Sequence, residues 1–440
     1  MIAVALRNLR HRPGGFVATF LTALLGAALL MAFASLIDTA AGADPGSADS
    51  LSTTAGVGGG WCLVIVAFAV TSTMSLSVRQ RAEQVQLLRR IGATGPQLRR
   101  MIVGEAAVVA LVASAAAVPV GLALGRVLVD LMRNTGQVAE PVPAAFGAVA
   151  LGIGFGVTLL GSIVAGVATA RRTAAPPGGK PERPRARRIG AVIFLLAATS
   201  CATLTATLMD GKGIDAMQTA GQAGIWASLG LALLAPELLR LVTAVLGGPV
   251  RTLGRAAGEL AVAGVRARTR QLAGAVMPVL LFTGIATGTI YMQFIENKAA
   301  AGQIEPDYAQ DVKTLNFVVI GMITLFVAVM LVNTLVAATA ARRREFAQHR
   351  LAGATRGQLT AMVALEGLLV TITGALGGTL ASLFTVVPFG SARADRLWPQ
   401  ATPLAYAVIV AIAVALTAAA TVGATRRQIR GPAALAARGV

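Results

Sequence analysis

Ten apolar stretches of near membrane-spanning length fill this 440-residue chain, and the basic residues lie in every second gap between them. About 20 apolar residues are enough to cross the hydrocarbon core of a bilayer. The chain is 55% hydrophobic and only 13% charged, a composition that would leave a soluble domain with much apolar surface in water. The pattern predicts an all-α polytopic membrane protein. The predicted spans are 16–37, 59–78, 103–129, 145–170, 189–209, 223–246, 271–295, 314–340, 359–388 and 403–425.

The charge distribution predicts the orientation of these spans. Most of the 38 Lys and Arg residues fall in alternate gaps, and most acidic residues fall in the gaps between those. Because basic loops stay in the cytoplasm, both termini are expected on the cytoplasmic side. The same distribution explains the net charge of +19 through topology. We therefore expect membrane lipid, and no nucleic acid, as a partner.

The sixth span, 223–246, carries unusual residues for a membrane helix. Pro236, Glu237 and Arg240 interrupt it, so part of this segment is expected at the membrane interface. The spacing of Glu237 and Arg240 predicts a pair on one helix face.

Segment 171–188 separates the spans into groups. It is rich in Pro, Gly and basic residues, which cannot build a core, and it reads as a cytoplasmic linker. The predicted arrangement is 4 + 2 + 4 helices. Its parts are a first four-helix repeat at 1–170, the linker at 171–188, two central helices at 189–250 and a second four-helix repeat at 251–440.

An internal repeat supports this division. An offset of 261 residues places Gly92-Ala93-Thr94 on Gly353-Ala354-Thr355, each between the second and third spans of its half. The sequence LRHR at 9–12 also resembles VRAR at 265–268. Both halves cross the membrane in the same direction, so the repeat is parallel. The further identities pair Arg89 with Arg350, Gln97 with Gln358, Leu98 with Leu359, Met101 with Met362, and Glu105 with Glu366.

Each copy of the repeated segment predicts the same local structure. Segments 80–90 and 341–350 are expected to form short amphipathic helices along the inner membrane surface. A glycine then ends the helix with a positive φ, and a threonine caps the long span that follows. Glu105 and Glu366, which enter their spans from the inside, are expected to cap or hydrogen-bond the turn rather than transfer protons.

These segments resemble the signature of the FtsX-like permease family, the membrane subunits of certain ABC transporters. The resemblance implies that each short helix is a coupling helix, which seats in a groove of an ATPase. A family Glu that could ion-pair with the ATPase is Gln84 in the first copy, with Glu83 beside it. The implied coupling residues are Glu83, Gln84, Arg89, Gly92, Ala93, Thr94, Gln97 and Glu105, together with Glu345, Arg350, Gly353, Ala354, Thr355, Gln358 and Glu366.

The lengths of the outer gaps indicate which members of this family the chain resembles. Gaps 38–58 and 296–313 are too short to bury a core, so the chain resembles long ten-span members without a large extracellular domain. It lacks a phosphate-binding loop, since Gly178-Gly179-Lys180 is followed by proline. We expect no catalytic residue, bound metal or cofactor in this chain. ATP and Mg would sit on a partner ATPase, present at two copies per chain in a bacterial inner membrane.

The expected function is export or extraction of an amphipathic or lipidic molecule by mechanotransmission. Arg126, Asp130 and Arg133, at the outer end of the third span, can pair with each other. They would either reach the headgroups or contact substrate in an outer vestibule. One alternative is a transmitter that controls a cell-wall enzyme or sensor without transport. Another is an ion-coupled secondary transporter, for which Glu237 is the candidate carboxylate in the membrane.

Overall fold

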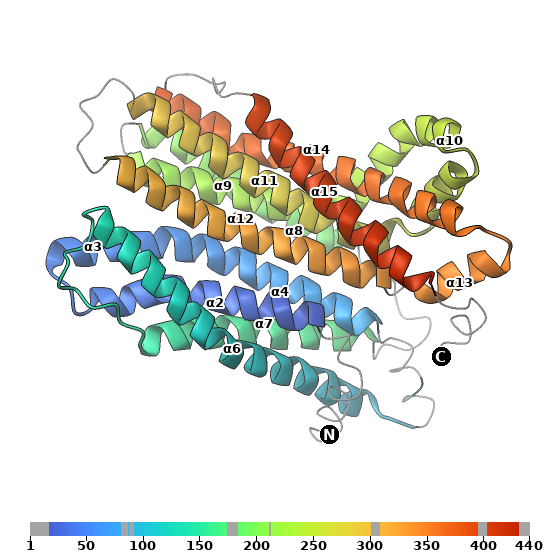
Figure 1. The fold of residues 1–440 in the computed structure, drawn as a ribbon, viewed down its shortest axis with the longest axis horizontal. Helices are drawn as coiled ribbons and strands as arrows, with labels where there is room; N and C mark the ends of the chain where they lie inside the picture. The colour runs from blue at the N-terminus through green and yellow to red at the C-terminus, as the bar shows by residue number, and fades with distance from the viewer. Residues whose placement is uncertain are drawn as a thin grey trace. The chain divides into compact units, whose positions relative to one another are not determined.

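A computed structural model describes residues 17–80, 87, 92–173, 184–210, 213–300, 309–340, 342–394 and 403–430, and the regular structure in these ranges is all helical (Figure 1). The chain divides into two compact units. Unit 1 comprises Met1–Pro181 and Gly302–Phe326, and unit 2 comprises Glu182–Ala301 and Val327–Val440. Helix α12 (Ala309–Ala340) is therefore divided between the two units.

The described helices confirm the all-α polytopic architecture. Nine of them are long and apolar enough to cross a membrane, or ten if the bent pair α9–α10 counts as one span. Two of these helices are much longer than a bilayer requires, with 40 residues in α6 and 39 in α14. The cytoplasmic location of the termini stays a prediction.

Unit 1 is organised around α2 (Val17–Ala40), which packs against α4 (Gly60–Gln80), α6 (Gly95–Asn134) and α7 (Ala148–Thr173). Helix α2 is apolar on all sides, as a helix enclosed by neighbours should be. Small residues bring α6 close to it. A Cβ on Gly121 would lie 2.8 Å from the Cβ of Met31, and one on Gly125 would lie 2.3 Å from Ser35 Oγ. Along these contacts the residue numbers of α2 and α6 increase together, so the two helices run parallel.

The segment 38–58, predicted as a loop, is mostly helical. It forms α3 (Pro45–Thr54) and a π-helical turn, η2 (Ala55–Gly59), that continue into α4. Asp44 caps α3 by accepting a hydrogen bond from the N–H of Ser47 at 3.1 Å, and Pro45 occupies the first turn. A sequence read for apolar length alone misses this helix, because its residues are mostly small and polar.

Unit 2 is organised around the parallel pair α11 (Thr269–Ala300) and α14 (Arg356–Ala394). A Cβ on Gly374 would lie 2.5 Å from Val279 Cβ, and one on Gly378 would lie 1.9 Å from Thr283 Oγ1. The hydroxyl of Thr283 donates a hydrogen bond to the carbonyl of Gly374 at 3.2 Å. The remaining helices of the unit are α8 (Pro184–Leu208), α9 (Gly213–Leu233), α10 (Ala235–Ala267), α13 (Arg343–Leu351) and α15 (Pro403–Gln428).

The predicted sixth span, 223–246, has the wrong bounds. Helix α9 ends at Leu233, and the chain bends by 69° before it continues as α10. Pro236 stands in the first turn of α10, at the interruption of the span that the sequence predicted. The predicted Glu237–Arg240 pair is also wrong, because the Glu237 carboxylate accepts a hydrogen bond from Arg187 of α8 at 2.5 Å.

Candidate coupling site

The second copy of the repeated segment forms the predicted short helix and turn. Helix α13 spans nine residues, with Phe346 and Ala347 buried. Arg343, Arg344 and Gln348 are exposed. Helix α13 therefore rests on its apolar side and presents a polar, mainly basic side.

The Gly-Ala-Thr turn has the predicted backbone in both copies. Gly92 has a φ of 100° and Gly353 a φ of 96°. A Cβ on either glycine would meet no atom within 4 Å. Glycine is therefore required here by its backbone conformation and not by crowding.

The repeated glutamine has a local structural role. The Gln358 side-chain oxygen accepts from the N–H of Thr355 at 2.9 Å, and Thr355 Oγ1 accepts from the N–H of Gln358 at 3.2 Å. This reciprocal capping box fixes the start of α14. In the first copy, Gln97 accepts from the N–H of Thr94 at 2.9 Å at the start of α6. The geometry thus explains the Thr-x-x-Gln spacing through helix capping.

Four charged residues form a charge cluster where α13 meets the long helices: Arg268, Arg342, Glu345 and Glu366. Arg342 Nη1 donates to Glu366 Oε2 at 2.5 Å, and Arg268 Nη2 donates to Glu366 Oε1 at 2.9 Å. Glu345 accepts from Arg342 Nη2 at 3.0 Å and also pairs with Arg268. The Glu366 side chain is only 2% exposed. Two carboxylates and two guanidinium groups balance, so the charge cluster has no net charge.

The charge cluster holds Glu345 and Arg342 in their ionised forms. Burial raises the pKa of the Glu345 carboxyl, but hydrogen bonds and charge from Arg342 and Arg268 outweigh burial and leave this pKa below its ordinary value. Burial lowers the pKa of Arg342, and Glu345 and Glu366 outweigh it, so this pKa is raised. The stabilisation from Glu345 is therefore present at neutral pH and lost as the pH falls through its lowered folded-state pKa.

The charge cluster joins three segments of unit 2. Arg268 lies between α10 and α11, Glu345 lies on α13, and Glu366 lies ten residues into α14. The expectation that Glu366 hydrogen-bonds the turn is not met, because its carboxylate binds the two arginines. Sequence reasoning did not identify Arg268 or Arg342 as site residues. A signal was present, since Arg268 belongs to the repeated VRAR sequence and Arg342 lies 261 residues after Arg81.

Gly264 makes room for the charge cluster. A Cβ at this position would lie 2.6 Å from both Arg268 Nη2 and Glu366 Oε1. We expect Gly264→Ala to lower the free energy of unfolding by about 1–2 kcal/mol, since it displaces one charged hydrogen bond. Thermal unfolding in detergent measures this effect. Gly274→Ala on α11 is the matched control, because nothing lies within 4 Å of its added Cβ; equal stability of the two variants would contradict the assignment.

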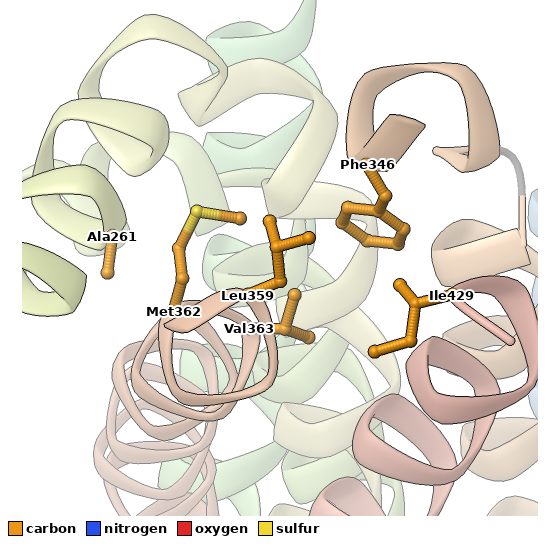
Figure 2. Close-up of a cluster of buried hydrophobic side chains, with 6 residues drawn as sticks. All are labelled: Ala261, Phe346, Leu359, Met362, Val363 and Ile429. Atoms are coloured by element: carbon orange, nitrogen blue, oxygen red, sulfur yellow. The ribbon is translucent and has the colours of Figure 1, made fainter. Parts of the chain in front are cut away.

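A hydrophobic cluster seats α13 on the long helices. Phe346 points between Leu359 and Val363 of α14 and Ile429 beyond the end of α15 (Figure 2). The guanidinium carbon of Arg342 lies 5.0 Å from the Phe346 ring centroid, within cation–π range. Arg350 Nη1 donates to the carbonyl of Ile429 at 3.1 Å and ties the end of α13 to α15. The full cluster is Ala261, Phe346, Leu359, Met362, Val363 and Ile429.

The first copy has a matching seat. Leu98 and Ile102 of α6 cluster with Ala170 of α7, and Ala93 and Met101 pack against them. Leu98 and Ile102 correspond by the repeat to Leu359 and Val363. Glu105, the counterpart of Glu366, is also buried. Glu83, Gln84 and Arg89 lie outside the described residues, so their predicted roles stay predictions.

At the other end of α6, the structure brings together two of the three predicted vestibule residues. Arg133 Nη1 donates to Asp130 Oδ1 at 2.6 Å, and the same guanidinium donates to the carbonyl of Val142. Arg133 thereby fixes the connection to α7. Arg126 is exposed, and no ion pair joins it to Asp130. Within the described ranges, no group of three or more His, Cys, Asp or Glu side chains is placed to hold a metal ion.

One family model matches the chain twice. The model of the FtsX-like permease C-terminal region matches residues 56–175 and 317–433, which together are more than half of the chain. Each match contains one Gly-Ala-Thr turn and the long helix that follows it, α6 or α14. No curated protein matches the chain significantly.

Proposed function

Because the chain belongs to the FtsX-like permease family, whose members are generally membrane subunits of ABC transporters, we propose that it couples ATP hydrolysis by a separate ATPase to substrate movement. Such permeases are not themselves catalytic. ATP and Mg would bind the ATPase, with two copies per chain. The chain would reside in a bacterial cytoplasmic membrane with both termini inside.

The observation that carries this proposal is the way α13 is attached. Its basic side is exposed, and Leu351 at its end is an apolar side chain that is 60% exposed. Such a surface suits a groove in a partner protein. Its other side is joined to α14 and to the start of α11 through the charge cluster and the hydrophobic cluster. A force on α13 would therefore reach both long helices.

The pair α11–α14 provides the path for that force across the membrane. Near one end, Arg268 and Glu366 join the two helices at 2.9 Å. At the other end, the guanidinium of Arg393 binds the carboxylate of Glu296 in a bidentate pair at 2.8 and 2.9 Å. Glycines keep the helices in contact between these pairs. The two helices would move together and displace the outer end of unit 2.

The outer segments support a proposal for the substrate class. The predicted outer gaps are short, so a large extracellular adaptor would find little protein surface to hold. We propose an amphipathic or lipidic substrate, such as a peptide, an antibiotic or a lipid-like molecule, taken from the membrane and extracted or exported by mechanotransmission. Asp130 and Arg133 lie at the end of α6 where such a molecule would leave.

Affinity purification of the tagged chain from its host tests the proposal. We expect a phosphate-loop ATPase to be recovered at about two copies per chain. Replacing both Gly92 and Gly353 by Leu should abolish recovery, because a side chain at positive φ costs about 1–2 kcal/mol and distorts each turn. The control variant carries leucine at Gly104 and Gly357, where an added Cβ has open space or ordinary contact. Recovery unchanged in the turn variant would contradict docking at these turns.

A further inference from the structure

Helix α10 is an antiparallel helical hairpin that stays at one end of unit 2. Its backbone leaves the helical region at Arg255, with a φ of 49° and a ψ of −132°. A Cβ on Gly247 would lie 3.4 Å from Val262 Cγ1, and one on Gly258 would lie 2.2 Å from the Val250 carbonyl oxygen. The second segment therefore folds back along the first, and Figure 1 shows this fold beside the bundle.

The hairpin begins and ends toward the same end of unit 2. Helices α9 and α11 run antiparallel, because Gly224 and Gly288 both lie against Thr385 whereas Gly284 lies against Ser228. The same register places the end of α9, at Leu233, level with Val279, which lies ten residues, or about 15 Å, past the start of α11. The 33 residues of α10 connect these two ends. Since the segment folds back on itself, it stays at this end of unit 2 and does not cross the membrane.

The outer side of the hairpin is apolar. Leu241 is 63% exposed, Val245 is 67% exposed, and Leu253, near the tip, is 86% exposed. Leu241 and Val245 are four residues apart, so they share one helix face. Leu239, Val242 and Val250 are buried. Leucines exposed to this extent would be costly in water, and they are favourable in the acyl region of a bilayer.

Basic residues lie beside this apolar face. Arg240 and Arg251 are eleven residues apart, three helical turns, and Arg255 lies at the turn between the two helical segments. Arg240 and Arg255 are exposed. Arg251 pairs with Glu259 at 3.5 Å, so its charge is less available to bind an anionic headgroup. An apolar face with a flanking row of arginines is typical of helices that lie in the interface of an anionic membrane.

We propose that the α10 hairpin is a lipid-binding anchor. Leu241, Val245 and Leu253 insert below the headgroups, and Arg240 and Arg255 bind anionic phospholipid phosphates. Charge complementarity selects a lipid surface over an acidic protein, because the arginines flank leucines that need an apolar medium. The anchor would hold the connection between α9 and α11, including Arg268 of the charge cluster, at a fixed depth.

Site-directed fluorescence in lipid nanodiscs tests the anchor without any ATPase. Leu253→Cys, in a chain with Cys62→Ala and Cys201→Ala, is labelled with an environment-sensitive dye. We expect a blue-shifted emission, strong quenching by nitroxide-labelled lipid and severalfold weaker quenching by iodide than at the control. The control is Leu351→Cys on α13, which is also an exposed leucine. Equal iodide quenching at both positions would overturn the proposal.

Two further results distinguish the partner. Protection of position 253 only after an ATPase is added would make the hairpin a protein contact and overturn the lipid assignment. In native mass spectrometry, Arg240→Gln with Arg255→Gln should weaken retention of phosphatidylglycerol by about fivefold per arginine, with no change for phosphatidylcholine. Equal retention of phosphatidylglycerol by this variant and the unchanged chain would contradict the headgroup assignment. These results do not depend on the proposed coupling function.

Discussion

Glu366→Gln is expected to lower the free energy of unfolding by about 3–5 kcal/mol, the usual cost of removing one partner of a buried ion pair. The change removes the carboxylate that both Arg342 and Arg268 bind, at 2.5 and 2.9 Å. Only Glu345 would remain to balance two guanidinium groups. Denaturant unfolding of the purified chain in mild detergent measures the loss.

Two variants show whether this loss comes from buried charge. Glu259→Gln also removes an acidic partner of an arginine, but its side chain is 64% exposed, and its effect should stay below about 1 kcal/mol. Arg342→Gln combined with Glu366→Gln leaves the pair Arg268–Glu345 in balance. The double variant should be more stable than the sum of the single effects indicates. Strict additivity would mean that the two side chains do not interact.

Gly378→Ala is expected to separate α11 from α14. The added Cβ would lie 1.9 Å from Thr283 Oγ1, 2.7 Å from the amide nitrogen of Gly284 and 2.8 Å from the carbonyl oxygen of Leu280. Two of these atoms belong to the backbone and cannot turn away. Overpacking of this kind costs about 1–3 kcal/mol and sometimes more. We expect loss of stability together with loss of ATP-driven substrate movement.

Gly423→Ala on α15 is the matched control for this prediction. Its added Cβ would meet no atom within 4 Å, so the usual preference for alanine should stabilise the helix by up to about 1 kcal/mol. The two Gly→Ala changes should therefore have opposite signs. Combining Gly378→Ala with Thr283→Ala removes only the side-chain clash. Full recovery in that combination would show that backbone contact between the helices is not the constraint.

The parts of the fold that sequence could predict are those set by local chemistry. Apolar length predicted the helices, and the position of Gly353 before Thr355 predicted a positive φ followed by a capped helix. Both features depend on residues that are neighbours in the chain. The short helix α13 was predicted for the same reason, to within a few residues.

The site could be predicted only in part, because its contacts join distant residues. Glu366 binds Arg268, which is 98 positions away in sequence. Similarly, Glu237 was expected to pair with Arg240 on its own helix, but the bend before α10 turns it toward Arg187. Spacing along one helix identifies possible partners, whereas the packing of several helices selects among them. The coupling role of the repeated segments stays a prediction that the packing supports.

The central claim is that motion at α13 reaches the far end of the α11–α14 pair through the charge cluster. Pulsed electron paramagnetic resonance on the complex with its ATPase tests this most directly, with spin labels at Ser391→Cys on α14 and Leu404→Cys on α15. We predict an ATP-dependent change in the distance distribution. The change should be clearly smaller in the variant with both Arg342→Gln and Glu366→Gln, which keeps the Arg268–Glu345 pair and the hydrophobic cluster, although the ATPase stays bound. An unchanged distribution with ATP, or a change of full size in this variant, would contradict the account.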